Sequence, residues 1–429
     1  MLNAIRFIDF NLQRLRSFFN SIHNIHNKLP NIIHVAGTNG KGSTVSFIRY
    51  ILKAHGLTSN VFISPHLVNF NERIRINEKL ISNDYLNEII KKLEEIESFN
   101  TLSIFEKTFA IACVAFYNNS ADFNIIEVGL GGRLDATNII ENPLISVITN
   151  IDYDHQDFLG RNVLGIAFEK ACIIKRDSLV IKSKQTQDIN NVFINYAKLL
   201  NSQLLLEDLD YKIIKGFLEY KNFKINLQKL GLIGEHQKTN AALACVASIN
   251  AMLKNNINPK VELIEYGLQN TIWPARVQQV DNLYNFKVNE GSEIYLDGAH
   301  NPNGAEILVN FIESKAHKFK NIDIVFGMLV KKDLLGFLDH IVKLQNNLKD
   351  KAIFCKITIY PININNHISY TQQNILKECI NLGLACETKD NIRDIFNKFK
   401  KNPNTRLVII CGSLYMLGDI LRDNKIEIN

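Results

Sequence analysis

A glycine-rich segment that also contains a lysine and two hydroxyl residues is the first part of the chain whose residue types suggest chemistry. Residues 34–44 read HVAGTNGKGST, and the β-branched residues before the first glycine predict a buried strand that runs into a loop. Glycines let backbone N–H groups approach phosphate oxygens, and a following helix adds the positive end of its dipole. The residues that we expect to form this phosphate site are Gly37, Thr38, Asn39, Gly40, Lys41, Gly42, Ser43 and Thr44.

The segment departs from the Walker A pattern G-x-x-x-x-G-K-S/T. Val35 stands where that pattern requires its first glycine, and Gly42 separates Lys41 from Ser43. Lys41 can reach terminal phosphates, and the hydroxyls that follow it can bind phosphate or Mg²⁺. The alternatives are a glycine turn without a ligand, or a phosphate loop of a different kind.

Composition limits the classes of protein to which the chain can belong. It has 429 residues, of which 46% are hydrophobic and 21% charged, so we expect two or three domains with substantial cores. The net charge of +6 is small, and no cluster of Lys and Arg with interleaved aromatics predicts a nucleic-acid partner. The seven cysteines are scattered without a C-x-x-C pair, which favours reduced core thiols in a cytoplasmic protein.

Targeting and membrane signals are not evident in the sequence. Residues 1–19 mix charged and apolar residues, unlike the uninterrupted apolar centre of a signal peptide. No apolar run approaches the roughly 18 residues that span a bilayer. We therefore expect a soluble cytoplasmic protein without a membrane partner, and a monomer.

Short β-branched runs alternate with helical patterns along the chain, which is typical of α/β units with a parallel sheet. Residues 83–96 place apolar side chains on one helical face. A second strand–helix series begins at residue 292, and the stretch TIWPARVQQVDN before it lacks clear periodicity. We therefore expect two α/β domains, 1–276 and 277–429. The predicted strands lie within residues 31–37, 58–64, 123–129, 143–151, 292–297, 322–329, 351–362 and 407–412.

Further motifs follow the glycine loop in a particular order. They are SPHLVNFNERIRIN at 64–77, EVGLGGRLDATN at 127–138, TNIDYDHQDFLG at 149–160, EKACIIK at 169–175, GEHQKTNAALA at 234–244, WPAR at 273–276 and DGAHNPNG at 297–304. Together with GTNGKGS they resemble the folylpolyglutamate synthase and dihydrofolate synthase family, relatives of the Mur cell-wall ligases. The G-K-G-S arrangement is similar to this family's own phosphate loop rather than to a damaged Walker A.

The resemblance implies a fold and a reaction. The fold is an N-terminal ATP-binding α/β domain of the P-loop type, whose parallel sheet is flanked by helices, and a smaller Rossmann-like C-terminal domain. The reaction is ATP-dependent ligation of L-glutamate to dihydropteroate or a reduced folate through an acyl phosphate, because phosphorylation turns a poor leaving group into a good one. Catalysis would depend on positioning and on neutralising charge.

The resemblance also implies a metal site, with two Mg²⁺ ions expected. Ser64, Glu127 and His155 match the positions that hold magnesium in the family. The first two lie at the ends of predicted strands, where open α/β sheets place ligand groups, and their oxygens suit a hard cation. The alternative for His155 is a structural role. Lys170 matches a lysine that the family carries as a carbamate, with an exposed helix lysine as the alternative.

Nucleotide and reaction-centre residues are implied in both predicted domains. Asn240 and Arg276 match positions that contact the nucleotide, and the guanidinium suits a phosphate as a forked donor. Asp297 and His300 match residues that reach ATP and the reaction centre when the domains close. A helix cap and a loop residue are the alternatives for these two. The residues with implied catalytic roles are Lys41, Lys170 and His300.

Substrate-binding residues are implied at five positions. Arg73 is the candidate for the glutamate carboxylate, with a surface salt bridge to Glu72 or a nearby acid as the alternative. Ser413 is a second candidate for the same group. Three more residues lie at the implied pterin side of the substrate site, where the alternative for the phenylalanine is a core position: Phe105, Asp135 and Ala136.

Three departures from the family pattern affect local structure. Ala275 replaces the glycine of W-P-G-R, so we expect it to avoid the left-handed conformation that glycine permits. Cys172 replaces a glycine and should act through packing. Lys331 replaces the first aspartate of D-K-D, leaving Lys332 and Asp333.

Two other functions remain as alternatives. A Mur-type cell-wall ligase would normally have the loop G-K-T/S without the extra glycine, and EVGLGGRLDATN is unlike that class. A non-catalytic nucleotide-binding regulator would have no use for the residues of a reactive metal centre, which the chain retains. The choice between dihydropteroate and reduced folates is left open.

Overall fold

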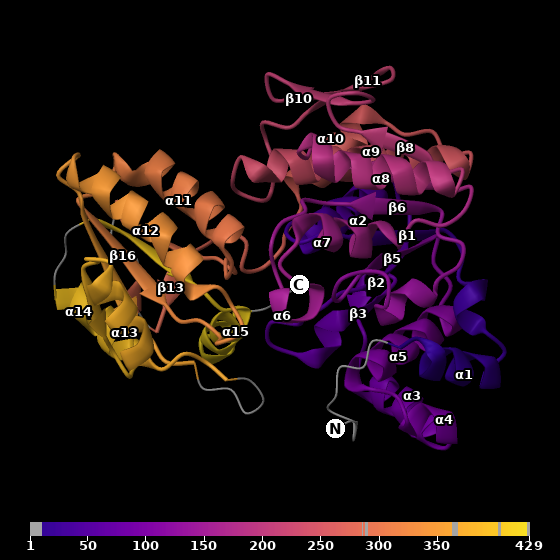
Figure 1. The fold of residues 1–429 in the computed structure, drawn as a ribbon, viewed down its shortest axis with the longest axis horizontal. Coiled ribbons are helices and arrows are strands. Elements are labelled where there is room, and N and C mark those ends of the chain that lie inside the picture. Colours follow the sequence, from indigo (N-terminus) through magenta and orange to yellow (C-terminus); the bar gives the residue numbers. More distant parts are fainter. Residues whose placement is uncertain (1–10, 285, 288–290, 363–367, 402–404, 427–429) are drawn as a thin grey trace. The chain divides into compact units, whose positions relative to one another are not determined.

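The chain forms two compact units (Figure 1) in the computed structural model, which describes residues 11–284, 286–287, 291–362, 368–401 and 405–426. The first unit comprises Met1–Asp152, Phe158–Gly231 and Gln237–Ile272. The second comprises Tyr153–Asp157, Leu232–His236 and Trp273–Asn429. Residues 1–10, whose charge pattern argued against a signal peptide, lie outside the described residues. The domain limits 1–276 and 277–429 stay a prediction.

An eight-stranded sheet organises the first unit, in the order β4-β3-β2-β5-β1-β6-β7-β8. Its strands run parallel except where β3 pairs antiparallel with β2 and with β4. Three further strands, β9, β10 and β11, form a separate antiparallel sheet. The strands are β1 Ile32–Ala36, β2 Ser59–Phe62, β3 Ile74–Ile76, β4 Lys79–Leu80, β5 Phe123–Glu127, β6 Ile145–Ile148, β7 Leu179–Lys182, β8 Gln203–Leu206, β9 Lys212–Ile214, β10 Phe217–Tyr220 and β11 Phe223–Asn226.

Helices surround the large sheet. Figure 1 shows α3 and α4 at one end of the first unit and the β10–β11 hairpin at the other. The α-helices from α1 to α10 are α1 Gln13–Ser21, α2 Lys41–Ala54, α3 Asn83–Glu94, α4 Glu97–Asn100, α5 Ile104–Asn118, α6 Gln156–Leu159, α7 Val163–Ala171, α8 Gln187–Leu199, α9 His236–Lys254 and α10 Val261–Gln269. The 3₁₀ helices are η1 Ile25–Lys28, η2 Phe70–Arg73 and η3 Ala136–Ile139.

The central strand β1 explains why the first unit is layered. All five of its residues are buried, as expected for a parallel strand covered on both faces. Ile126 of β5 packs with α1, α3 and α5, whereas Ala36 of β1 and Ile148 of β6 pack with α7 and α8. The carboxyl ends of these strands meet along one edge of the sheet, where ligands bind in open α/β sheets.

The second unit is a smaller α/β layer structure. Its six-stranded sheet has the order β12-β15-β19-β16-β17-β18 and is parallel except for the β12–β15 pair. The strands are β12 Gln278–Val280, β13 Asn282–Leu283, β14 Phe286–Lys287, β15 Glu293–Leu296, β16 Asn321–Phe326, β17 Phe354–Ile359, β18 Cys386–Thr388 and β19 Arg406–Cys411. The helices are α11 Pro302–Ala316, α12 Leu334–Lys349, α13 Gln372–Asn381, α14 Ile392–Lys401 and α15 Leu414–Asp423.

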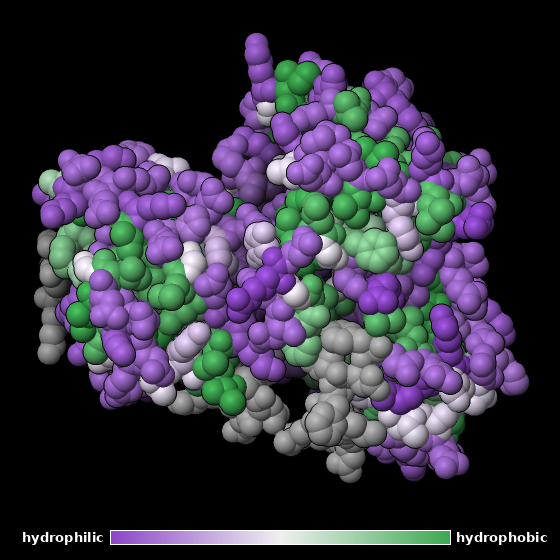
Figure 2. Space-filling view, in the orientation of Figure 1, coloured by the Kyte–Doolittle hydropathy of each residue, from purple (hydrophilic) through white to green (hydrophobic). Residues whose placement is uncertain are grey.

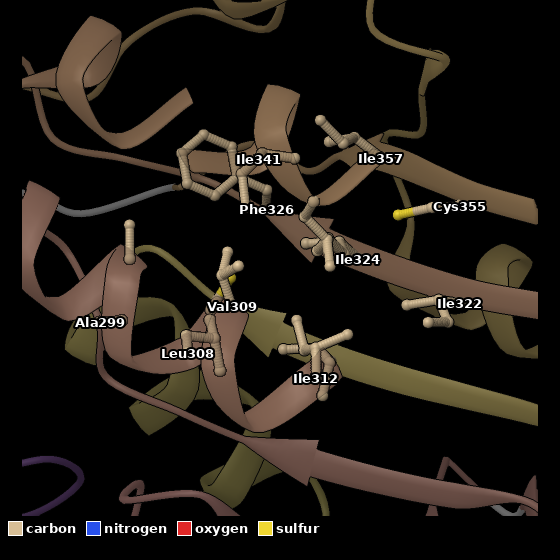
Figure 3. Packing of buried hydrophobic residues seen from close by; sticks show 14 of the residues in the cluster. Ala299, Leu308, Val309, Ile312, Ile322, Ile324, Phe326, Ile341, Cys355 and Ile357 are labelled. Carbon is tan, nitrogen blue, oxygen red and sulfur yellow. The ribbon is translucent and has the colours of Figure 1, made fainter. Parts of the chain in front are cut away.

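One continuous core joins α11, α12 and α13 to a single face of this sheet. Figure 3 shows side chains of α11, such as Leu308 and Ile312, facing Ile322 and Ile324 of β16. On the β14 side, α14 packs through Phe396 against Phe286 at a ring distance of 5.7 Å. The predicted α/β class with a Rossmann-like second part is confirmed.

The observed strands and helices agree in part with those predicted from the sequence. Each predicted strand overlaps an observed one, but β3, β4, the strands from β7 to β14, and β18 were not predicted. The helix after the glycine loop begins at Lys41, with Gly40 as its N-cap. None of the seven cysteines forms a disulfide, and six are buried. On the face drawn in Figure 2, hydrophilic residues predominate over both units. Among the described helices, none has the length and apolar character needed to span a membrane.

Candidate active site

The glycine loop connects β1 to α2 and is fixed to the end of the neighbouring strand β6. Thr38 donates its backbone N–H to the Asn150 carbonyl at 2.7 Å, and its hydroxyl donates to the Asp152 carbonyl at 2.9 Å. Gly37 and Gly40 have φ angles of +151° and +89°. A side chain at Gly40 would collide with Asn240, so this position requires glycine for both space and conformation.

Two lysines converge on one carbonyl of this loop. Lys41 Nζ donates to Gly37 O at 3.1 Å, and Lys170 Nζ donates to the same oxygen at 2.9 Å. Lys170 reaches the loop from α7 and is only 5% exposed, so the alternative of an exposed helix lysine is wrong. Two ammonium groups beside the amino end of α2 create a strongly positive environment that suits a polyphosphate.

An amide pair on α9 supports the hydroxyl side of the loop. Gln237 donates from Nε2 to Ser43 Oγ at 3.4 Å and accepts from Asn240 Nδ2 at 3.0 Å. Within the described chain, the fully buried Thr44 hydroxyl has no hydrogen-bond partner. Sequence reasoning missed Gln237, although its spacing from Asn240 places both amides on one helical face.

Ser64 and Glu127 come together at the carboxyl ends of the paired strands β2 and β5. Ser64 donates its backbone N–H to Glu127 Oε2 at 3.3 Å, and the carboxylate is only 5% exposed. A carboxylate and a hydroxyl fit Mg²⁺, which prefers oxygen and keeps waters and phosphate oxygens as further ligands. No cluster of three His, Cys, Asp or Glu side chains suited to a metal occurs in the described part of the chain. A cation here would therefore depend on ligands beyond such a cluster.

His155 lies in the second unit, beside the partly buried carboxylate of Asp154. Its φ is +51°, a strained left-handed conformation, and its backbone N–H donates to Asp154 Oδ1 at 2.8 Å. Lys332 Nζ lies 2.7 Å from Asp154 Oδ1, and His300 Nε2 lies 3.6 Å from Oδ2. Burial alone would raise the pKa of Asp154, but the contact with His300 and the charge of Lys332 hold it well below its usual value.

Asp297 is buried and His300 is partly buried, and both lie in the loop between β15 and α11 of the second unit. His300 Nδ1 lies 2.7 Å from the Gly298 carbonyl, and burial lowers the pKa of its imidazole. Asp297 accepts the backbone N–H groups of Val277 and Ala299, each at 2.8 Å. Burial raises the pKa of Asp297, and nearby Arg276 opposes that rise. Asp297 is therefore not a helix cap.

The turn that carries Arg276 contradicts one expectation. Ala275 was expected to avoid positive φ, but its φ is +56°, and that of Val277 is +47°. The Ala275 N–H donates to Gln278 Oε1 at 2.9 Å, and its carbonyl accepts from Gly298 N at 2.9 Å. These two bonds hold the backbone in the conformation that a glycine would adopt without strain.

Arg73 lies at the end of η2. Its Nε donates to His66 Nδ1 at 2.8 Å, and its guanidinium carbon lies 5.7 Å from the centre of the Phe70 ring. The carboxylate of Glu72 instead accepts backbone N–H groups, including that of Leu67 at 2.8 Å. Sequence reasoning missed His66 and Glu72, although SPHL and ERI were both recognised as motifs.

The three residues of the implied pterin side lie in the first unit. Phe105 is half-buried and packs against Phe62 at a ring distance of 5.9 Å. Asp135 accepts from the Thr137 hydroxyl at 2.6 Å and from Leu130 N at 2.8 Å, so its carboxylate shapes its own loop. Burial raises the pKa of Asp135. Ala136 is buried at the start of η3.

The remaining predicted positions have plain structural environments. Ser413 is buried in the second unit and caps α15 by accepting from Met416 N at 3.5 Å. Cys172 is buried at the end of α7, which agrees with a packing role. Lys331 is exposed, while Asp333 caps α12 by accepting from Gly336 N at 2.9 Å.

Comparisons with known proteins agree with this fold. The family model described as Mur ligase middle domain matches residues 35–248, and the one described as dihydrofolate synthetase, C-terminal domain, matches residues 278–423. The Bacillus subtilis dihydrofolate synthase/folylpolyglutamate synthase is 31% identical over 415 residues, covering 91% of this chain and 90% of that protein. The probable dihydrofolate synthetase of Schizosaccharomyces pombe is 29% identical over 440 residues, covering 98% of this chain and 100% of that protein.

Solved structures give the same result. The Mycobacterium tuberculosis folylpolyglutamate synthase complexed with ADP has a TM-score of 0.85 at 26% identity, over 99% of this chain and 96% of that chain. E. coli FolC in complex with DHPP and ADP has a TM-score of 0.84 at 25% identity, over 98% and 95% of the two chains. The fold and the phosphate loop define an α/β nucleotide-binding protein of the Mur ligase type. Within that class, the chain belongs to the dihydrofolate synthase/folylpolyglutamate synthase family.

Proposed function

We propose that this chain adds L-glutamate to a pterin substrate, either dihydropteroate or a reduced folate polyglutamate, at the expense of ATP. The products are the amide, ADP and phosphate. The observation that supports this proposal most directly is the convergence of Lys41 and Lys170 on the Gly37 carbonyl of the phosphate loop. Membership of the family supports the reaction class, because its named members are dihydrofolate and folylpolyglutamate synthases.

The chemistry follows from the poor reactivity of a carboxylate toward an amine. A carboxylate oxygen of the pterin substrate attacks the γ-phosphorus of ATP and releases ADP, which gives an acyl phosphate. The glutamate nitrogen then attacks the acyl carbon, and the carbon–oxygen bond to phosphate breaks while the amine loses a proton. The site must therefore neutralise charge on the triphosphate and hold two substrates in line.

The first unit supplies the groups that we propose for ATP. The loop 37–44 binds the phosphates through backbone N–H groups, hydroxyls and Lys41, and Asn240 contacts the nucleotide. Magnesium, when bound, supplies charge neutralisation of the phosphates. We propose two ions, with Ser64, Glu127 and His155 as protein ligands. In the second unit, Arg276 and Asp297 contact the nucleotide and His300 serves the reaction centre.

Lys170 has a second proposed state. Its buried amine gains a carboxylate by reaction with CO₂, which forms the N–C bond and releases one proton. The change converts a cation into an anion that helps to order the metal site. Its burial and its position beside the phosphate loop support this proposal.

The remaining substrate contacts are proposed on the same basis. Arg73 and Ser413 bind the carboxylates of glutamate, and Phe105, Asp135 and Ala136 form the pterin side. We further propose that the protein acts as a cytoplasmic monomer. The limits 1–276 and 277–429 are proposed for its ATP-binding and C-terminal ligase domains.

The proposal is tested by ADP release from the purified protein with ATP, Mg²⁺ and L-glutamate. Parallel reactions contain dihydropteroate, tetrahydrofolate or no pterin. We expect ADP release that requires both glutamate and one of the pterins, and the preferred pterin distinguishes the first glutamylation from later ones. ATP binding without turnover on any pterin would instead favour the nucleotide-binding regulator.

A further inference from the structure

The segment between β2 and β3 is built around one buried carboxylate. Glu72 is 4% exposed and accepts the backbone N–H groups of Leu67, Val68 and Asn69 at 2.8, 2.9 and 2.5 Å. The Asn69 side chain completes a capping box by accepting a backbone N–H of η2. Hydrogen bonds to an ionised acceptor are among the stronger ones in proteins, so this single carboxylate fixes the path of the loop.

The next residue, Arg73, is held at both its backbone and its side chain. Its carbonyl accepts from Ile63 N at 3.0 Å, which ties it to the end of β2. Its Nε donates to His66 Nδ1 at 2.8 Å, so His66 accepts a hydrogen bond from the Nε edge of the guanidinium. Phe70 lies beside both groups, with its ring 6.0 Å from the His66 ring and 5.7 Å from the Arg73 guanidinium carbon.

From this geometry we propose that His66 and Glu72 are positioning residues for the Arg73 guanidinium. Glu72 fixes the loop that carries His66, and His66 fixes the rotation of the guanidinium plane. The group positioned in this way recognises the carboxylate of the incoming amino acid, which rests on the proposed function. A planar fork binds a carboxylate with two parallel bonds only when its plane is correctly oriented.

The structure gives a reason why positioning matters here. Arg73 is half-buried at a loop, and an arginine side chain loses substantial rotamer freedom when it is immobilised. Because the hydrogen bond to His66 exists before any ligand binds, part of that entropy cost falls on folding rather than on glutamate binding. Loss of the imidazole should therefore weaken glutamate binding more than it slows the chemical step.

Steady-state kinetics of the full chain test this proposal, with glutamate varied at saturating ATP and pterin. We expect His66→Ala to raise the KM for glutamate about tenfold, as for loss of a hydrogen bond to a charged group, with little change in kcat or in the KM for ATP. His66→Asn should restore most of the affinity, because its Oδ1 can accept from Arg73 Nε. His55→Ala is the matched control, since that imidazole bonds the Ile51 carbonyl on α2.

A double-mutant cycle separates positioning from a general loss of structure. In an Arg73→Ala background, His66→Ala should change the glutamate KM by less than about twofold, since its effect acts through the missing guanidinium. Glu72→Gln should raise the same KM, because its amide directs N–H groups at backbone donors. An unchanged KM in His66→Ala, or equal effects of that change with and without Arg73, would overturn the proposal. Wild-type protein without glutamate-dependent ADP release would instead overturn the proposed function together with this inference.

Discussion

At the scale of single residues, the phosphate loop combines strict backbone requirements with a high density of positive charge. Gly40 has φ +89° and faces Asn240, while Lys41 and Lys170 share one carbonyl acceptor. Hydrogen bonds from an ammonium group to an ionised acceptor are stronger than those to a carbonyl oxygen. A triphosphate supplies such acceptors.

Replacement of the charged groups tests this arrangement. Lys41→Ala and Glu127→Ala should each lower turnover by about two orders of magnitude or more, because Lys41 is proposed to neutralise phosphate charge directly and Glu127 to hold the magnesium that does so. Lys53→Ala on the same helix is the control, since its ammonium lies near the Tyr50 ring at the other end of α2. Circular dichroism and thermal unfolding should show an intact fold in each variant. Near-normal turnover in both variants would contradict the proposed roles of Lys41 and Glu127.

At the scale of elements, the turn before β12 stores backbone strain beside the candidate nucleotide residue Arg276. Ala275 and Val277 both have positive φ, which costs an L-residue roughly 1–2 kcal/mol each. Their hydrogen bonds to Gln278 and Asp297 hold the turn in place. Such strain is common where a loop must present a functional side chain.

Ala275→Gly should therefore stabilise the protein, in contrast to most alanine-to-glycine changes. The relief of strain exceeds the added entropy of the unfolded chain, so we expect the free energy of unfolding to rise by about 0.5–1 kcal/mol. Urea unfolding measures the change. Ala244→Gly within α9 serves as the opposite control, with an expected loss of about 1 kcal/mol or more. A lower free energy of unfolding in Ala275→Gly would contradict the claim that Ala275 is strained.

The strand β1 carries a buried imidazole that links stability to pH. His34 is fully buried, with Nε2 2.9 Å from the Thr137 hydroxyl, and burial together with the charge of Lys175 lowers its pKa from 6.5 to about 3. Between these two pKa values the unfolded chain binds a proton that the folded chain does not. Stability is therefore lost as the pH falls.

The size of this effect can be measured by urea unfolding at two pH values. When the pH is lowered from 7 to 5, His34 alone should decrease the free energy of unfolding by about 2 kcal/mol. In His34→Asn the decrease in unfolding free energy over this interval should be smaller by about the same amount, whatever the stability at pH 7. An identical decrease in wild type and variant would show that His34 is not a buried neutral group.

At the scale of the whole molecule, sequence patterns predicted the strand–helix alternation because buried parallel strands are apolar along their length. They did not predict the β9–β11 sheet, whose strands are short and mix exposed with buried residues. They also did not predict that Tyr153–Asp157 and Leu232–His236 group with the second unit. Long-range contacts decide that grouping, and local periodicity does not report them.

In the candidate site, too, sequence motifs predicted some residues and missed others whose roles depend on long-range contacts. The glycine loop has a strong local signature that predicts a phosphate site, and the family resemblance pointed to Ser64 and Glu127 at strand ends; these assignments stay predictions. The motifs missed the supporting residues Gln237 and Glu72, whose roles depend on which groups the fold brings to them. The prediction that Ala275 avoids positive φ was wrong for a similar reason. Its conformation is fixed by hydrogen bonds to residues that the fold brings to the turn.

The acyl phosphate is the central chemical claim, and oxygen transfer tests it most directly. The pterin substrate is labelled with ¹⁸O in its reactive carboxylate and allowed to react with ATP and L-glutamate, and the released phosphate is analysed by mass spectrometry. If the carboxylate is phosphorylated before amide formation, each released phosphate carries one labelled oxygen at full enrichment. Amide product accompanied by unlabelled phosphate would contradict this mechanism.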